Sequence, residues 1–315
     1  VIDRLFKGLG SLLSGRGVTV YDGTGRLGPD HTVTVEHGVG GGQEGTSTIQ
    51  ADHVVLATGS SPRTIGGFEV DGELVVTSDE LLSITEVPAR VVVIGGGAIG
   101  CEFASMLSDL GSEVTVLEAL PEILVGCDAD VAKAVRRSFR RRGITVHSGV
   151  SVTGHEPAGG STVVSFGDER VEVDLVVMAV GRSPRGDAAG LVGTRVEVDE
   201  RGFISVDDRL LTGEPGVYAV GDVVATPQLA HVAFAEGMFV VKDLLGESPL
   251  PLNAATVPWC IYTHPEVAFA GLTEAAAREA GHEVVVSSHR FVGNGRAMIV
   301  GDTDGLVKVV AEVAP

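Results

Sequence analysis

Short apolar runs rich in β-branched residues alternate along this chain with glycine-rich turns and with stretches of helical periodicity. Strand-like runs occur at residues 91–94 (VVVI) and 114–118 (VTVLE), and helical patterns extend to Gly111 and from about Leu229. This alternation is typical of α/β domains rather than of all-β or all-α chains. We therefore expect a fold of the α/β class.

One supersecondary unit occurs twice. Residues 51–62 (ADHVVLATGSSP) and 173–184 (VDLVVMAVGRSP) agree at seven of twelve positions, and each follows a predicted hairpin, at 32–49 and 161–173. The repeat offset of 122 residues places the first-copy equivalent of Gly95 before Val1. We therefore expect a first nucleotide-binding domain that lacks its beginning. We also expect truncation at the other end, since residues 308–315 (KVVAEVAP) stop in or just after a strand.

A glycine-rich turn at residues 95–100 (GGGAIG) follows the predicted strand at 91–94 and opens a helix. In this context Gly95 permits the tight turn, Gly97 lets a pyrophosphate approach the backbone, and Gly100 lets the helix lie close to the strand. The phosphates would lie at the positive end of the helix. The pattern predicts a dinucleotide site that includes Gly95, Gly97, Ala98, Ile99 and Gly100.

Glu118 ends the next strand, 18 residues after Gly100. Its carboxylate would accept hydrogen bonds from the adenosine ribose and repel a 2′-phosphate, and no Arg or Lys follows before Lys133. NAD is therefore favoured over NADP. The alternatives are a structural relic or a flavin-binding turn. Glu102 is explained without any ligand as a carboxylate near the positive end of a helix.

A second candidate site lies at residues 216–222 (GVYAVGD), a short apolar strand that ends in Gly-Asp before Pro227 and a helical stretch. Asp222 could hold a sugar or ribitol hydroxyl beside the helix start. It could equally be a turn residue that caps the next element. The pattern alone leaves both interpretations open.

Composition narrows the class of protein. The chain has 315 residues, 44% of them hydrophobic, which favours two or three domains. The net charge of −19 opposes nucleic-acid binding, and the basic cluster at 136–142 is interpreted as the solvated face and last turn of a helix. No apolar run approaches the ~18 residues that span a bilayer, so we expect no membrane association and a cytoplasmic protein.

The three cysteines, Cys101, Cys127 and Cys260, are far apart, and their spacing fits neither a zinc site nor a redox pair. We interpret them as buried or idle thiols, and we expect no metal site and no catalytic residue in this chain.

Several motifs together, in their order and spacing, resemble the pyridine nucleotide–disulfide oxidoreductase family along essentially the whole chain. They are residues 57–60 (ATGS), 93–102 (VIGGGAIGCE), 116–118 (VLE), 180–184 (VGRSP), 218–222 (YAVGD), 229–231 (LAH) with 236–237 (EG), and 262–273 (YTHPEVAFAGLT). Within the family, Glu118 and residues 115–121 are most similar to the dihydrolipoamide dehydrogenase branch. Glutathione and mercuric reductases usually carry basic residues there for NADPH.

The resemblance implies two Rossmann-like domains, for FAD and NAD, and the start of an α+β dimer-interface domain. The expected limits are 1–87 and 207–251 for the FAD domain, 88–206 for the NAD domain and 252–315 for the partial dimerisation domain. On the flavin side, Asp222 would bind the ribitol, Ala230 and His231 the isoalloxazine edge, Gly25 the adenine, and Thr58 and Gly59 would lie along the flavin. On the NAD side, Glu102 would reach the nicotinamide, and Gly181 and Arg182 would line its pocket.

The family's redox-active cysteine pair and its His-Glu dyad do not occur in these residues. For the full-length parent, the resemblance implies oxidation of dihydrolipoamide by NAD⁺ through FAD, a homodimer, and a lipoyl-bearing acyltransferase or carrier protein as partner. The rival hypotheses are an NADPH-dependent disulfide or mercuric reductase and a short protein that only binds nucleotide.

Overall fold

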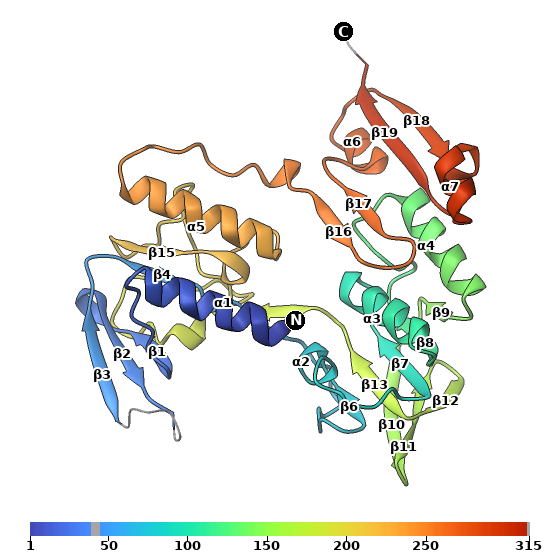
Figure 1. Cartoon of the computed structure of the whole chain (residues 1–315), viewed down its shortest axis with the longest axis horizontal. Coiled ribbons are helices and arrows are strands. Elements are labelled where there is room, and N and C mark those ends of the chain that lie inside the picture. Colours follow the sequence, from blue (N-terminus) through green and yellow to red (C-terminus); the bar gives the residue numbers. More distant parts are fainter. Residues whose placement is uncertain (39–44, 314–315) are drawn as a thin grey trace. The chain divides into compact units, whose positions relative to one another are not determined.

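The computed structural model describes residues 1–38 and 45–313, which form two compact units. One unit comprises Val1–Ser60 and Pro184–Leu252, and the other comprises Ser61–Ser183 and Asn253–Pro315. Figure 1 labels the helices and strands of both units.

The division at residues 60 and 183 differs from the limits at 87 and 206 that the sequence suggested. Strand β6 (Val75–Val76) pairs in parallel with β13 (Leu175–Met178), so the segment before Pro88 belongs to the second unit. In the first unit, the backbone N–H of Ile204 donates to the carbonyl oxygen of Val223, which ties residues after 183 to that unit. The last division, after Leu252, lies one residue from the expected one.

A five-stranded parallel sheet forms the centre of the second unit, with strand order β6-β13-β7-β8-β9. Helices α3 and α4 cover one face, where Val91, Val93 and Phe139 are buried, and an antiparallel sheet covers the other, where Val92 and Phe166 are buried. Strands buried on both faces explain the continuous apolar runs of the sequence. The elements are β7 (Arg90–Ile94), α3 (Ala98–Asp109), β8 (Glu113–Glu118), α4 (Ala129–Arg141), β9 (Thr145–Ser148), β10 (Val152–Ala158), β11 (Ser161–Phe166), β12 (Glu169–Val173) and the short α2 (Ser78–Leu81).

Residues from 253 onward pack against α3 and α4 within the same unit. Ser105 Oγ accepts a hydrogen bond from the backbone N–H of His264 (3.0 Å), and Ser138 Oγ donates to the carbonyl oxygen of His264 (3.0 Å). The His264–Pro265 peptide bond is cis. The elements are η4 (Ala254–Thr256), β16 (Trp259–Ile261), β17 (Val267–Phe269), α6 (Glu274–Glu279), β18 (Val284–Arg290), η5 (Phe291–Gly293), α7 (Gly295–Val300) and β19 (Leu306–Glu312).

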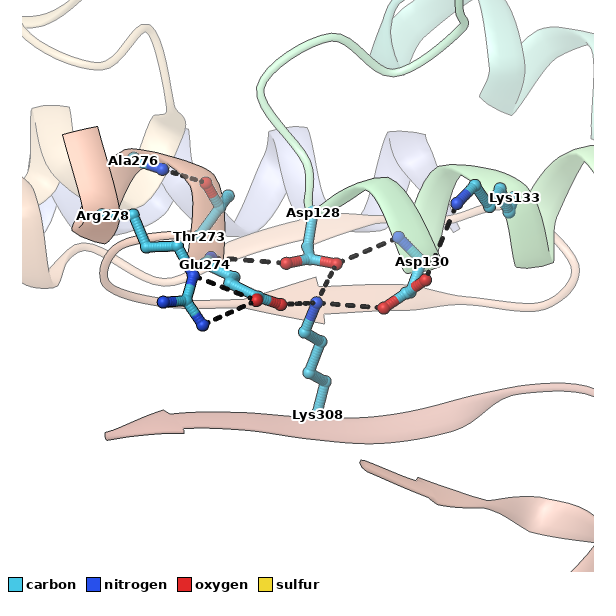
Figure 2. A network of polar contacts seen from close by, with 8 residues as sticks. All are labelled: Asp128, Asp130, Lys133, Thr273, Glu274, Ala276, Arg278 and Lys308. Atoms are coloured by element: carbon cyan, nitrogen blue, oxygen red, sulfur yellow. Dashed lines mark hydrogen bonds and ion pairs between the residues drawn. The ribbon is translucent and has the colours of Figure 1, made fainter. Parts of the chain in front are cut away.

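Figure 2 shows a polar network that connects this segment to the rest of its unit, centred on Lys308 of β19. The Nζ atom of Lys308 lies 2.9 Å from Asp128 Oδ1, 3.0 Å from Asp130 Oδ2 and 2.9 Å from Glu274 Oε2. Asp128 caps the start of α4 by accepting from the backbone N–H of Asp130. One ammonium group therefore joins the β18–β19 hairpin to α4 and α6.

The first unit contains a three-stranded antiparallel sheet, a two-stranded parallel sheet in which β15 pairs with β4, and helix α5. Leu56, Val217 and Ala219 lie in one apolar cluster, and Tyr218 and Phe239 lie in another. The elements are α1 (Ile2–Gly15), β1 (Thr24–Leu27), η1 (Pro29–His31), β2 (Thr32–Glu36), β3 (Thr46–Gln50), β4 (Val54–Leu56), η2 (Asp187–Ala189), β15 (Val217–Ala219), η3 (Gly221–Val223) and α5 (Ala230–Leu244). The short strands β5 (Ser60–Pro62) and β14 (Arg182–Pro184) pair with each other.

The predicted repeat is confirmed. In each copy a three-stranded antiparallel sheet, β1-β2-β3 or β10-β11-β12, precedes a short parallel strand, β4 or β13. Residues 39–44, within the first predicted hairpin, lie outside the described part of the chain, as do residues 314–315. Helix α1 was not anticipated, and its apolar side chains, Leu5 and Phe6 among them, are exposed. None of the helices in the described ranges has the length and apolar character needed to cross a bilayer.

Candidate dinucleotide and flavin sites

The glycine turn follows β7 at the carboxyl edge of the parallel sheet, beside the end of β13. Gly95 has φ = 109°, and a Cβ atom there would overlap the carbonyl oxygen of Ala179. A Cβ atom on Gly100 would overlap the carbonyl oxygen of Gly95. Both positions therefore require glycine, one for the turn and one for the close approach of α3 to β7, as the sequence predicted.

Gly97, in contrast to Gly95 and Gly100, has open space around it. It is exposed, it is the N-cap of α3, and a Cβ atom there would meet nothing within 4 Å. No side chain caps this helix start. The space above Gly97 and the positive end of α3, where Ala98 and Ile99 form the first turn, thus fit the approach of a pyrophosphate group.

Glu118 lies beside this turn and is only 9% exposed. Its Oε2 accepts a hydrogen bond from the backbone N–H of Gly96 (2.5 Å), and its Oε1 accepts from that of Leu120 (2.7 Å). Each carboxylate oxygen can accept more than one hydrogen bond, so capacity remains for ribose hydroxyls. Among residues 1–38 and 45–313, no cation forms an ion pair with Glu118. A phosphate on the ribose would therefore face an uncompensated negative charge.

The predicted nicotinamide residues lie around the same sheet edge. Glu102, in the second turn of α3, is half-buried, and its Oε1 accepts from the backbone N–H of Tyr262 (2.8 Å). Gly181 has φ = 110° and follows β13, and its carbonyl oxygen accepts from the backbone N–H of Arg63 (2.9 Å). Arg182 is the first residue of β14. Glu102 thus already has a structural partner in the segment after residue 252.

The first unit contains a mostly apolar cavity of about 790 Å³ beside η3 and α5. Gly59, Asp222 and Ala230 line it, together with Phe234 and Met238 of α5. This volume is typical of a small-molecule or cofactor site. The cavity therefore fits part of a flavin.

The other predicted flavin residues do not line this cavity, but two of them are adjacent in sequence to residues that do. Thr58 and His231 directly neighbour lining residues, and Thr58 Oγ1 donates to the carbonyl oxygen of Arg185 (2.9 Å). Gly25 lies in β1 of the antiparallel sheet and is not part of the lining. Asp222 Oδ2 accepts a hydrogen bond from Ser60 Oγ (2.6 Å), which fixes its carboxylate from a residue far away in the sequence.

Glu236 is a component of this region to which the sequence analysis gave no role. It is fully buried, and its Oε2 accepts from the backbone N–H of Gly221 (2.6 Å), the residue before Asp222. Its Oε1 has no partner in the described residues. The sequence signal for this role was a carboxylate in the middle of an otherwise apolar helical stretch. A buried carboxylate is costly unless it has a hydrogen-bond partner, so such a position indicates a specific polar contact.

The thiols and the basic cluster were largely as predicted. Burial raises the pKa of Cys101 to about 12 and that of Cys127 to about 11, so both are poor nucleophiles at neutral pH, whereas Cys260 is exposed. The cluster at 136–142 lies on α4 and its C-cap. Arg142 is an exception to the solvated interpretation, since its side chain is 16% exposed and donates to Ser105 and Asp109. Within the described residues, no group of three or more His, Cys, Asp or Glu side chains could hold a metal ion.

Comparisons with known proteins agree with this geometry. The family model described as pyridine nucleotide-disulphide oxidoreductase matches residues 2–237, and its dimerisation domain matches residues 257–314. The chain is 41% identical to a dihydrolipoyl dehydrogenase of Haloferax volcanii, over 99% of this chain and 66% of that protein. It is 38% identical to that of Bacillus subtilis, over 99% of this chain and 68% of that protein. The chain thus spans about two thirds of the length of these relatives.

The chain is also similar in fold to solved structures of related proteins. The HOCl-induced flavoprotein disulfide reductase RclA of Escherichia coli superposes with a TM-score of 0.89 at 27% identity, covering 99% of this chain and 71% of that one. LpdA of Mycobacterium tuberculosis superposes with a TM-score of 0.90 at 27% identity, covering 98% and 68%. These relationships imply FAD and NAD(H) as cofactors.

Proposed function

Since the chain belongs to the pyridine nucleotide–disulphide oxidoreductase family, we propose that it provides the nucleotide-binding part of an NAD-dependent dihydrolipoyl dehydrogenase. The whole protein would convert dihydrolipoamide and NAD⁺ to lipoamide, NADH and a proton. The observation that carries this proposal is the buried carboxylate of Glu118 beside the glycine turn. An NADPH-dependent relative should offer a cation at that place.

The residues of the second unit would hold NAD. The backbone of Gly97, Ala98 and Ile99 would bind the pyrophosphate, and Glu118 would bind the adenosine ribose. Glu102 and Gly181 would face the nicotinamide end, with Arg182 beside them.

The residues of the first unit would hold part of FAD, which supplies the electron transfer between thiols and nicotinamide when bound. Asp222, oriented by Ser60, would accept a hydrogen bond from the ribitol, and the start of α5 at Ala230 and His231 would face the isoalloxazine edge. Thr58 and Gly59 would lie along the flavin. Glu236 would act as a positioning residue, because it holds the N–H group of Gly221. Gly25 would lie near the adenine.

The partners proposed for the whole protein are a second copy of itself and a lipoyl-bearing acyltransferase or carrier protein. The match of residues 257–314 to a dimerisation domain supports the first. The names of the relatives support the second. A cytoplasmic location stays a prediction.

The test is steady-state oxidation of dihydrolipoamide by the whole protein that contains this chain, with NAD⁺ and with NADP⁺. Glu118→Gln should raise the KM for NAD⁺ about tenfold or more with little change in kcat, because a charge-assisted hydrogen bond to the ribose is lost in ground and transition states alike. Glu113→Gln, at the exposed opposite end of β8, is the matched control and should leave KM unchanged. If the whole protein reduced another disulfide or Hg(II) with NADPH faster than it oxidised dihydrolipoamide with NAD⁺, the proposal would be contradicted.

A further inference from the structure

Helix α4 carries a row of cations on one side. Lys133, Arg136, Arg137 and Arg140 are spaced i, i+3, i+4 and i+7, which places them on one face. The buried residues of α4, such as Val135 and Phe139, are on the opposite face. Like charges at this spacing repel one another, so this row of cations lowers the stability of the helix. In a chain of net charge −19 such a row is a local exception.

A cavity of about 520 Å³ lies along this face. All four cations line it, and Thr145 and Val146 at the start of β9 form part of its other wall. Because β9 is an edge strand of the parallel sheet, no further strand covers this side in the described part of the chain. The cavity contacts the amino end of β9, whereas the glycine turn follows the carboxyl end of β7.

The cations are only partly neutralised. Arg136 pairs with Glu122 (2.8 Å), and Lys133 lies 3.9 Å from Asp130. Within residues 1–38 and 45–313, the side chains of Arg137 and Arg140 form neither an ion pair nor a hydrogen bond. Two guanidinium groups therefore line the cavity with all their donors available to a ligand.

We propose that this α4 cavity binds a compact polyanion, a small molecule that carries two or more linked phosphate groups. Guanidinium groups bind phosphate oxygens through two parallel hydrogen bonds. Neighbouring side chains on one helix face are about 5–6 Å apart at Cβ, so linked phosphates can contact two or more of them at once. A monoanion can neutralise only part of the row. The volume is that of a small-molecule site rather than of a flat polymer-binding surface.

The test is calorimetric titration of the 315-residue chain with inorganic triphosphate in metal-free, low-salt buffer. We expect a dissociation constant below about 1 mM, as for contact with at least two charged donors. Inorganic phosphate should bind at least about tenfold more weakly. Triphosphate should also raise the melting temperature, because it relieves the repulsion along α4.

Paired variants separate a site from general attraction. R137A/R140A should weaken triphosphate binding at least about tenfold and leave NADH binding unchanged. R170A/R278A removes the same charge from two exposed positions outside the cavity, and its affinity should stay within about twofold of the original. R137K/R140K should retain part of the affinity, since charge remains without the planar fork.

Titrations with different ligands identify the source of the phosphate groups. ATP that binds more tightly than triphosphate, with the same loss in R137A/R140A, indicates a nucleotide, and equal affinities indicate free polyphosphate. Equal losses in R137A/R140A and R170A/R278A, or no detectable triphosphate binding, would overturn the proposal. A short polyglutamate that binds more tightly than triphosphate, with the same dependence on Arg137 and Arg140, would replace the phosphate assignment with an acidic peptide.

Discussion

Lys308→Met tests the connection between the β18–β19 hairpin and helix α4. The lysine side chain is 9% exposed, and its Nζ contacts the carboxylates of Asp128, Asp130 and Glu274. Methionine preserves the length and apolar stem of the side chain but removes the charge. The variant therefore leaves three carboxylates close together without their shared cation (Figure 2).

The expected cost lies between two limits. Removal of one partner from a fully buried pair costs about 3–5 kcal/mol, and loss of an exposed pair costs about 0.2–1 kcal/mol. Asp128 is 14% exposed and resembles the first case, whereas Asp130, at 47%, resembles the second. Because burial is mixed, we expect a loss of about 2–3 kcal/mol in the free energy of unfolding of this unit.

The effect should depend on pH. Partial burial opposes the shift, but hydrogen bonds from Lys308 and from backbone N–H groups lower the pKa of Asp128, and the hydrogen bond from Lys308 lowers the pKa of Glu274. Burial likewise opposes the shift at Lys308, but the three carboxylates raise its pKa. The carboxylate contributions are present above their unfolded pKa values of about 4 and are lost as the pH falls through the folded ones. The lysine contribution is present below about pH 10.4 and is lost as the pH rises through its raised pKa.

Urea unfolding of the chain at pH 7 and at about pH 3.5 measures the cost of Lys308→Met at neutral pH and the decrease of that cost at acid pH. Lys133→Met is the matched control, because Lys133 is 71% exposed, lies near the same Asp130 and should cost less than about 0.5 kcal/mol. If Lys308→Met were as stable as the original chain at pH 7, or if its deficit grew at acid pH, the three carboxylates would not depend on Lys308 for their stabilising contribution.

Three further predictions concern the turn, the thiols and the activity of the chain alone. Gly97→Ala should fold normally but bind NADH at least about tenfold more weakly, since the added methyl group fills only the space meant for the pyrophosphate. Gly100→Ala should unfold at lower urea concentration because its Cβ overlaps the carbonyl oxygen of Gly95, and equal stability of the two variants would contradict the geometry. A thiol reagent at pH 8 should label Cys260 rapidly and Cys101 only on unfolding, because the pKa of Cys101 is raised to about 12; rapid labelling of Cys101 in the folded chain would contradict its burial. The 315-residue polypeptide with added FAD should not turn over dihydrolipoamide, since its cysteines include no pair four residues apart; measurable NADH formation would disprove this.

The nucleotide turn could be predicted because its signals are local. A strand, a glycine-rich turn, a helix and an acid at the end of the next strand follow one another within 30 residues. Gly100 is required by a contact within this stretch, with the carbonyl oxygen of Gly95, and Gly95 is required by a contact with Ala179, the residue after β13. The βαβ unit predicted Glu118 at the end of β8, but its hydrogen bond with the backbone N–H of Gly96 was not predicted.

The unit boundaries and the buried charged residues could not be predicted, because they depend on contacts between residues far apart in the sequence. β6 contains only two residues, and it becomes a strand by pairing with β13 about 100 residues later, so the unit boundary could not be located at residue 60. The buried positions of Glu236 and Lys308 depend on which elements pack around them. Helix α1 has an amphipathic sequence, but none of its residues is buried, so no packing partner in the sequence pattern indicated it.

Titration of the 315-residue chain with NADH and NADPH under identical conditions shows which of the two nucleotides the site around Glu118 binds more tightly. We expect NADH to bind at least about tenfold more tightly, because the 2′-phosphate would meet the buried carboxylate of Glu118 with no cation paired to it among the described residues. In Glu118→Gln this preference should shrink. Equal affinities for the two nucleotides, or tighter binding of NADPH, would show that Glu118 does not select NAD.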